Sequence, residues 1–165
     1  MAPTRDPIEL SPPDISAYQN GNTDIDYVTT YDSGVAGPHV MVNAVTHGNE
    51  LCGAIVVDFL FRQGVRPTRG KLTLSFANYQ AFLNFDKRHP GMSRYVDEDF
   101  NRLWSPDVLD GPRDSAELRR AREMRPLIDT VDLLLDIHSM QTRAPALMLA
   151  GPLPKGRQLA GAVLV

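Results

Sequence analysis

The sequence predicts an α/β fold with a mixed, largely parallel sheet flanked by helices. Apolar runs of strand length alternate along the chain with segments of helical length, which is the order found in sheets crossed by connecting helices. The 165 residues, 42% of them apolar and 22% charged, suffice for one hydrophobic core. We therefore expect one domain over residues 25–165, preceded by an irregular lead-in over residues 1–24 that is rich in Pro, Asp and Asn.

The first part of the domain has the pattern of two strands, a polar turn and a helix. Residues 27–31 are β-branched and aromatic, which favours a short strand, and residues 39–45 form an apolar run of strand length. Residues 46–50 (THGNE) are polar. Residues 51–63 are apolar on nearly every side and are followed by a glycine, as in a buried helix with a glycine stop.

The middle of the chain predicts a strand, a long connection and a second helix. Residues 71–77 alternate well enough for a strand, whereas residues 78–112 have little periodicity. A compact domain normally keeps so long a connection only for function. Residues 115–127 predict a helix with Ser115 as its N-cap. We expect the arginines of this helix to form a solvated face: Arg119, Arg120, Arg122 and Arg125.

The last part predicts two further strands and a helix. Residues 130–137 are nearly continuous in Val, Leu and Ile, as in a strand covered on both faces. Residues 146–150 are a candidate fourth strand, and a helix is expected from Lys155 onward. The apolar run at residues 159–165 (LAGAVLV) ends without a polar cap, so we expect either a buried terminus or a chain that is cut short.

Composition excludes several classes of partner. A formal net charge of -3 argues against binding to a nucleic-acid backbone, which requires a basic surface. No apolar run approaches the roughly 20 residues that span a bilayer, and the first 13 residues lack the pattern of a secretion signal. We therefore expect a cytoplasmic protein without a membrane partner. The single cysteine, Cys52, excludes an internal disulfide and is expected to be a small core residue.

Two of the four histidines directly follow predicted buried strands. His47 and Glu50 are three residues apart at a strand-to-helix turn, and His138 follows the strand at residues 130–137. Sites in open α/β sheets form outside the carboxyl ends of the strands. Two imidazoles and a carboxylate are a ligand set of hydrolytic zinc sites. The alternative is that both histidines are satisfied strand-end residues and that Glu50 is a carboxylate favoured by a helix N-terminus.

The long connection carries side chains suited to gripping a carboxylate. Arg94 is followed by Asp-Phe-Asn-Arg at residues 99–102, and arginine binds carboxylates through paired N–H donors. Together with THGNE at residues 46–50 and DIHS at residues 136–139, this order of motifs resembles the succinylglutamate desuccinylase/aspartoacylase family. Members of that family are zinc amidohydrolases related to the metallocarboxypeptidases. Tyr79 departs from the family, which usually has proline at that position.

The resemblance implies a role for each motif residue. His47, Glu50 and His138 match the zinc ligands, and Arg94 matches the catalytic arginine that polarises the scissile carbonyl. The pair that binds the substrate's carboxylate is matched by Asn101 and Arg102. By comparison with the carboxypeptidases, Asp99 is similar to the carboxylate that accepts the free N–H of the first histidine ligand; a local loop contact is the alternative. Asp136, two residues before His138, either orients that ligand or only lies near the site.

The resemblance also implies an activity and a missing part. The expected reaction is zinc-dependent hydrolysis of the amide bond of a small-molecule N-acyl amino acid. The family's general base is a Glu well beyond the DIHS block, but residues 139–165 contain neither Asp nor Glu. We therefore expect these residues to be the N-terminal portion of a carboxypeptidase-like catalytic domain. The alternatives are a metallocarboxypeptidase and a zinc-binding fragment without catalysis. The sequence does not indicate an oligomeric state.

Overall fold

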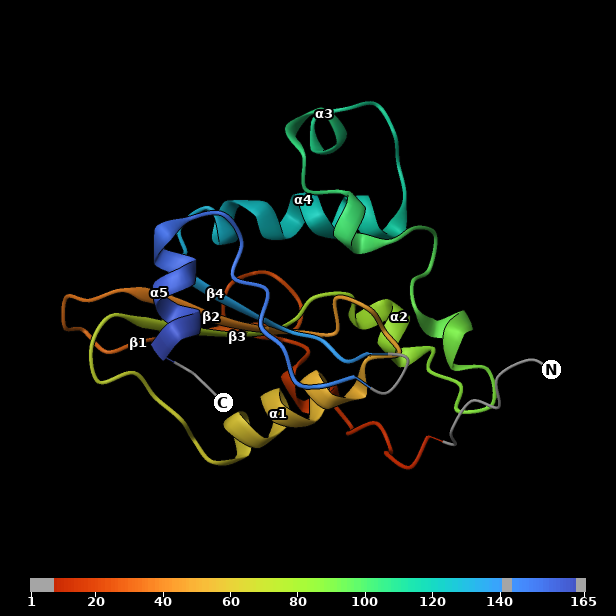
Figure 1. The fold of residues 1–165 in the computed structure, drawn as a ribbon, viewed down its shortest axis with the longest axis horizontal. Helices are drawn as coiled ribbons and strands as arrows, with labels where there is room; N and C mark the ends of the chain where they lie inside the picture. Colours follow the sequence, from red (N-terminus) through yellow and green to blue (C-terminus); the bar gives the residue numbers. More distant parts are fainter. Residues whose placement is uncertain (1–7, 141–143, 163–165) are drawn as a thin grey trace.

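A computed structural model describes residues 8–140 and 144–162 of the chain. A four-stranded sheet in the order β1-β3-β2-β4 lies at its centre (Figure 1). The strands are β1 (Val28–Asp32), β2 (His39–Ala44), β3 (Lys71–Phe76) and β4 (Leu133–Ile137). β2 pairs in parallel with both β3 and β4, whereas β1 pairs with β3 antiparallel. The predicted mixed, largely parallel sheet is confirmed.

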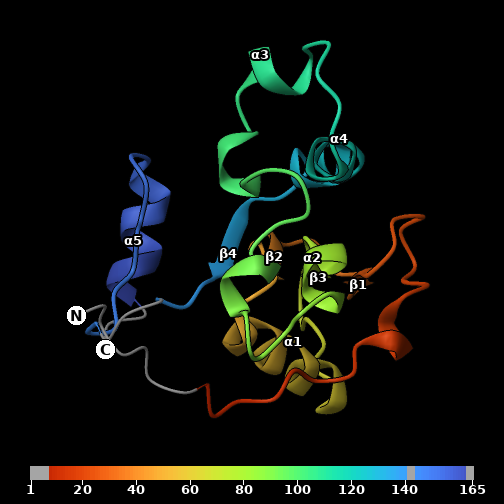
Figure 2. The ribbon, with the colours of Figure 1, turned by 90° about the vertical axis from the view of Figure 1, so that its right-hand side faces the viewer.

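Helices cover both faces of the sheet. α1 (Leu51–Arg62) lies against one face and α4 (Ala116–Ile128) against the other, while α5 (Pro154–Ala162) stands outside the β4 edge (Figure 2). The short helices are α2 (Tyr79–Leu83), α3 (Pro106–Leu109) and the 3-10 turns η1 (Ser16–Tyr18), η2 (Pro90–Ser93) and η3 (Phe100–Arg102). In the described residues no helix is long and apolar enough to cross a membrane.

The sheet separates two clusters of buried apolar side chains. On the α1 side, Leu51, Ala54 and Val57 pack against sheet residues that include Leu74 and Phe76. On the α4 side the cluster consists of Val28, Met41, Ala77, Phe100, Leu103, Leu109, Leu118, Ala121 and Met124. Phe100 and Leu103 belong to the long connection, so the core itself holds that segment in place.

The lead-in packs onto the domain instead of extending away from it. Ile15 is buried in the α1-side cluster, and the Tyr18 ring stacks on Phe61 with centroids 4.2 Å apart. The Tyr18 hydroxyl donates to Asp58 Oδ1 at 2.7 Å. Burial, followed by the hydrogen bond to Asp58, raises the pKa of Tyr18 to about 12. Residues 1–7 of the expected lead-in lie outside the described residues.

Most of the expected elements are confirmed, but the strand at residues 146–150 is wrong. Residues 144–150 are irregular, and Leu147 and Leu149 are exposed, because this segment pairs with no strand among the described residues. The helix expected from Lys155 is α5, whereas residues 163–165 of the terminal apolar run lie outside the described part. The long connection at residues 78–112 contains four short helical segments.

Two expectations about solvent exposure are also wrong. β4 is an edge strand, and its Leu134 and Leu135 are exposed, so it is not covered on both faces. Arg120 does not lie on a solvated helix face. Its guanidinium is buried and donates to the carbonyl oxygens of Ala77 and Asp26, at 2.8 and 2.7 Å. Arg120 thus ties α4 to the end of β3 and to the segment before β1.

Candidate metal centre

The predicted ligand residues lie at the carboxyl ends of two neighbouring parallel strands. β2 ends at Ala44 and leads through a short turn to His47 and to Glu50, which directly precedes α1. β4 ends at Ile137, so His138 follows it immediately. Because β2 and β4 are paired in parallel, their carboxyl ends meet at one edge of the sheet.

A strained residue begins the turn that carries His47. Val45 is fully buried and has φ of +53°, in the left-handed region that a β-branched side chain rarely adopts. Such a conformation costs about 1–3 kcal/mol and persists only where surrounding contacts hold it. The Val45 carbonyl accepts the Asn78 amide at 3.1 Å, and the preceding Ala44 carbonyl accepts the Ala77 amide at 2.8 Å. The end of β3 therefore fixes the direction in which the turn leaves β2.

Gly48 brings the same turn against the segment that carries Arg94. A Cβ on Gly48 would lie 2.3 Å from the Ala81 carbonyl carbon and 2.5 Å from the Ser93 oxygen, both of them backbone atoms. The Gly48 amide donates to the Arg94 carbonyl at 3.0 Å. Only glycine allows this close approach, which places His47 beside Arg94.

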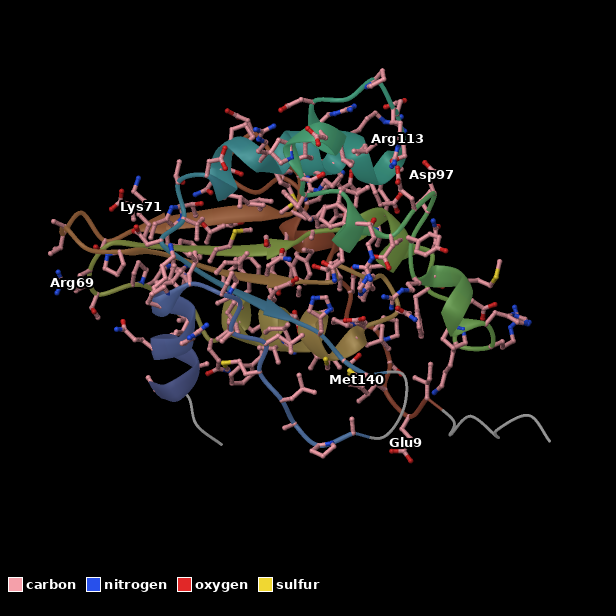
Figure 3. The ribbon with its side chains drawn as sticks, turned by 45° about the horizontal axis from the view of Figure 1, so that its top comes forward. Glu9, Arg69, Lys71, Asp97, Arg113 and Met140 are labelled. Carbon is pink, nitrogen blue, oxygen red and sulfur yellow. The ribbon has the colours of Figure 1, made fainter. Side chains whose placement is uncertain are left out.

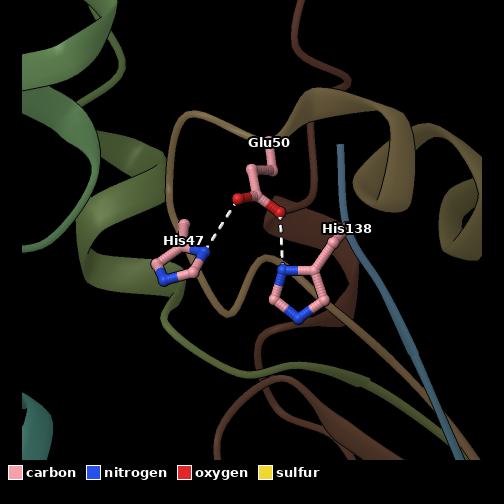
Figure 4. Close-up of side chains that lie close together, drawn as sticks. All are labelled: His47, Glu50 and His138. Carbon is pink, nitrogen blue, oxygen red and sulfur yellow. Dashed lines mark hydrogen bonds and ion pairs between the residues drawn. The ribbon is translucent and has the colours of Figure 1, made fainter. Parts of the chain in front are cut away.

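The side chains of His47, Glu50 and His138 converge on one point (Figure 4). His47 Nδ1 lies 2.8 Å from Glu50 Oε1, and His138 Nδ1 lies 2.8 Å from Glu50 Oε2. One potential ligand atom from each residue falls within 4.8 Å of the others. His47 and Glu50 are buried, whereas a third of the His138 side chain is exposed, so the cluster opens towards solvent at His138.

The pairing of these groups shifts two pKa values strongly. Burial alone would raise the pKa of Glu50, but the hydrogen bonds from His138 and His47 outweigh it and lower the pKa to about 2. Hydrogen bonds to Asp136 and Glu50 raise the pKa of His138 to about 10. Glu50 is therefore held as a carboxylate, in the charge state that a metal ligand needs.

The outer nitrogen of each histidine also faces a carboxylate. His47 Nε2 lies 3.1 Å from Asp99 Oδ1, and His138 Nε2 lies 2.8 Å from Asp136 Oδ2. Burial alone would raise the pKa of Asp99, but the contact with His47 lowers it. A carboxylate behind a histidine ligand fixes its tautomer and ring orientation. With these contacts in place, the Nδ1 atoms of both histidines face the Glu50 carboxylate.

Arg94 joins the cluster from the long connection. Its Nη2 atom lies 2.9 Å from His47 Nε2 and donates to Asp99 Oδ2 at 3.4 Å. Its Nη1 atom lies 3.6 Å from Glu50 Oε1. The Arg94 side chain is about a quarter exposed, at 27%, so it faces the cluster and is also reached by solvent.

Asn101 and Arg102 lie on η3 beside Asp99, with both residues exposed. The Asp99 side chain accepts the Asn101 amide at 3.0 Å, and Arg102 Nη1 donates to the Asn101 carbonyl at 3.3 Å. Among the described contacts, neither side chain bonds to the cluster. The structure thus brings five of the predicted site residues together and places these two at the adjoining surface.

The donor set fits a divalent transition metal such as zinc. Two imidazole nitrogens and a carboxylate oxygen are the kinds of ligand that zinc accepts in hydrolytic sites. Cys52 is partly exposed instead of a buried core residue, and its thiol points to the His138 carbonyl at 3.5 Å. It lies outside the group of converging ligand atoms.

Sequence reasoning missed the groups that support Asp136. Asn43 Nδ2 donates to Asp136 Oδ1 at 2.9 Å, and Thr46 Oγ1 donates to Asp136 Oδ2 at 2.9 Å. Ser75 Oγ in turn donates to Asn43 Oδ1 at 2.5 Å. The available signal was an asparagine within the apolar run of β2, because a buried polar side chain in a strand needs a partner.

Comparison with known proteins gives a family and a fold. A model of the succinylglutamate desuccinylase/aspartoacylase catalytic domain matches residues 36–160. The chain is 35% identical over 115 residues to an N-acyl-aromatic-L-amino acid amidohydrolase (carboxylate-forming) A of Danio rerio, covering 61% of this chain and 32% of that protein. It is 30% identical over 103 residues to aspartoacylase of Mus musculus, covering 57% of this chain and 31% of that protein.

A solved structure agrees with the fold. The crystal structure of the succinylglutamate desuccinylase from Chromobacterium violaceum matches with a TM-score of 0.54 at 22% identity, covering 68% of this chain and 36% of that one. The chain spans about a third of the length of the curated relatives that it matches. Since the family model covers most of the sequence and includes all the converging residues, the chain belongs to the succinylglutamate desuccinylase/aspartoacylase family.

Proposed function

We propose that this chain contributes the metal-binding half of a site for zinc-dependent hydrolysis of the amide bond of an N-acyl amino acid. The observation that carries the proposal is the convergence of His47, Glu50 and His138 beside the Arg94 guanidinium. Two curated relatives are named as an N-acyl amino acid amidohydrolase and an aspartoacylase, which supports the substrate class.

The ligand set is proposed to hold zinc through His47, Glu50 and His138. When bound there, zinc would lower the pKa of its water towards about 7 and polarise the amide carbonyl. Asp99 and Asp136 act behind the two histidines, holding the ring orientations that direct both Nδ1 atoms inward.

Arg94 is proposed to stabilise the negative charge that develops on the carbonyl oxygen. A guanidinium already in place, with its position fixed by Asp99 and His47, needs no reorganisation when that charge forms. Asn101 and Arg102 are proposed to bind the substrate's carboxylate. Their exposure on η3, next to Asp99, leaves their donors available to a small molecule.

Two alternative functions would use the same ligand residues. Residues 139–165 contain neither Asp nor Glu, so no acidic general base is assigned after His138. This favours, as a second candidate, a zinc-binding chain that does not catalyse hydrolysis by itself. A metallocarboxypeptidase would use the same ligands and arginine but would accept a peptide.

One experiment separates these functions. We expect the 165-residue chain to bind about one equivalent of zinc. We expect a protein that joins this chain to the rest of the family's catalytic domain to hydrolyse N-acetyl or N-succinyl amino acids and to leave a peptide panel intact. His47→Ala should remove zinc binding and turnover. His89→Ala is the matched control, because His89 is an exposed loop histidine paired with Asp86, and it should change neither.

Each other outcome selects another function. Zinc binding without turnover supports the non-catalytic alternative, and cleavage of peptides alone supports the carboxypeptidase. Equal zinc content in wild type and His47→Ala contradicts the proposed site.

A further inference from the structure

We propose that Glu117 is a positioning residue of the site, although it touches none of the converging ligand atoms. It fixes the segment at residues 94–99, which carries Arg94 and Asp99, against the turn at residues 45–50, which carries His47 and Glu50. The functional meaning of this role rests on the proposed hydrolase site, whereas the hold on the segment can be tested without it.

Glu117 is fully buried and makes four hydrogen bonds. Its Oε1 atom accepts from Val96 N at 2.6 Å and from Asn78 Nδ2 at 3.0 Å. Its Oε2 atom accepts from Asp97 N at 3.0 Å and from Glu98 N at 3.2 Å. One carboxylate thus accepts hydrogen bonds from three consecutive backbone amides and one side-chain amide.

Four N–H donors require an acceptor with two oxygens. A carboxylate offers about four lone-pair sites, whereas a glutamine amide would turn an NH2 group towards two of these donors. Among the described residues no basic side chain pairs with Glu117, so its charge is balanced by the amides and by its place in the first turn of α4. An acidic side chain this deeply buried without a cation is uncommon and indicates a specific role.

The three backbone amides lie between two site residues. Val96, Asp97 and Glu98 are three of the four residues between Arg94 and Asp99. The Arg94 carbonyl at one end accepts the Gly48 amide at 3.0 Å. Asp99 at the other end contacts His47 Nε2 at 3.1 Å. Glu117 therefore holds the middle of the segment at residues 94–99, and both ends of this segment contact the turn at residues 45–50.

Asn78 links Glu117 to the ligand turn by a second route. Its side-chain amide donates to Glu117, and its backbone amide donates to the carbonyl of the strained Val45 at 3.1 Å. Its side-chain oxygen accepts the Ala81 amide at 3.4 Å at the start of α2, the helix against which Gly48 packs. Both segments of the site are thus tied to one buried carboxylate.

At the protein surface, a second hydrogen bond joins Asp97 to the first turn of α4, with the side chain of Asp97 as the acceptor. Asp97 is exposed (Figure 3), and its Oδ2 atom accepts the Ala116 amide at 2.7 Å. Asp97 thereby caps the first turn of α4, while Glu117 of that turn binds the Asp97 amide. Loss of either bond should loosen the segment from α4.

The decisive variant is Glu117→Gln, with Arg120→Met as its matched control. Arg120 is also buried on α4 and also loses several hydrogen bonds, but these reach Asp26, Phe76 and Ala77 instead of the segment at residues 94–99. Hydrogen–deuterium exchange of the metal-free proteins measures the hold on the segment. We expect faster exchange at residues 95–99 in Glu117→Gln, with β2 and β3 unchanged, and slow exchange at those residues in Arg120→Met.

Zinc affinity and turnover measure the consequence for the site. Because Asp99 and Arg94 would lose their fixed positions, we expect Glu117→Gln to lower zinc affinity or kcat/KM by about 10- to 100-fold, as for other groups behind a ligand. Arg120→Met should lower neither to that extent.

A surface variant covers the case in which Glu117→Gln does not fold. Asp97→Ala removes the hydrogen bond to the Ala116 amide without emptying the core, and Asp114→Ala is its control, since Asp114 is exposed at the same end of α4 and pairs with Arg119. Only Asp97→Ala should speed exchange at residues 95–99. Wild-type exchange in both Glu117→Gln and Asp97→Ala overturns the proposal. Faster exchange with no zinc binding or turnover in the wild type contradicts the proposed function and leaves the hold by Glu117 standing.

Discussion

At the scale of single residues, the carboxylate behind His138 is the sharpest test of the candidate site. We expect Asp136→Asn to lower zinc affinity by about 10- to 100-fold, because Asn keeps the shape of the side chain but not the charged acceptor that faces His138 Nε2. Competition titration against a chelating dye measures the change. Asp107→Asn, on the exposed side of α3, should bind zinc like the wild type. Equal affinity in both variants would show that Asp136 does not act on His138.

The same residues show how far a sequence can predict a site. His47 and Glu50 lie in the polar turn after one apolar run, and His138 follows another. The three could be placed together because the strand ends of a parallel sheet meet at one edge. The support of Asp136 by Asn43 depends on the register of β2 against β4, which pairs these two residues. Register is set by packing between distant segments, so the sequence left the role of Asp136 open.

Arg120 illustrates the opposite error. Four arginines on one helix predicted a solvated face, since charged side chains are rarely buried without a partner. The partners exist, but they are backbone carbonyls at the end of β3 and before β1, brought under α4 by the fold. Glu117 was missed for the same reason, because its donors come from Asn78 and from residues 96–98.

At the scale of elements, Tyr18 is one of the side chains that hold the lead-in to the α1 side of the sheet. Tyr18 stacks on Phe61 and donates to Asp58 Oδ1. We expect Tyr18→Phe to lower the free energy of unfolding at neutral pH by about 1 kcal/mol, the usual net value of one hydrogen bond. Urea denaturation measures this loss. Tyr95→Phe, which alters an exposed tyrosine, is the control.

The pKa of Tyr18 adds a pH dependence to that prediction. Burial raises this pKa from 10.0 to about 12, so the folded state favours the neutral phenol. The resulting stability is fully present below pH 10 and is lost as the pH rises towards 12. Between these values the wild type should lose more stability than Tyr18→Phe. Parallel losses in the two proteins would contradict the coupling of Tyr18 to folding.

Strands were predicted correctly where an apolar run also had a neighbour to pair with. Residues 39–44, 71–76 and 133–137 became β2, β3 and β4. Residues 146–150 have a similar composition but remain irregular, because strand formation needs a ladder and none reaches them among the described residues. An apolar composition indicates that a segment can be buried in a strand. Whether it pairs in a sheet depends on whether the rest of the chain places another strand beside it.

At the scale of the whole molecule, the outer edge of β4 pairs with no strand of the described chain. β4 is last in the strand order, and on this side the described chain offers no further strand. Leu134 and Leu135, which point to opposite faces, are exposed at 47% and 41%. Exposed edges with apolar side chains favour pairing with another chain. We therefore expect the 165-residue chain to self-associate through this edge.

Sedimentation velocity over a wide range of concentrations tests the edge directly. The wild type should sediment faster as its concentration rises, and Leu135→Lys should suppress this change, because a charge beside an open edge opposes pairing with a second copy. Val35→Lys is the matched control, since Val35 is a similarly exposed apolar residue in the connection between β1 and β2. It should associate like the wild type. A sedimentation coefficient of the wild type that does not depend on concentration would show that α5 and the residues around it shield β4 sufficiently.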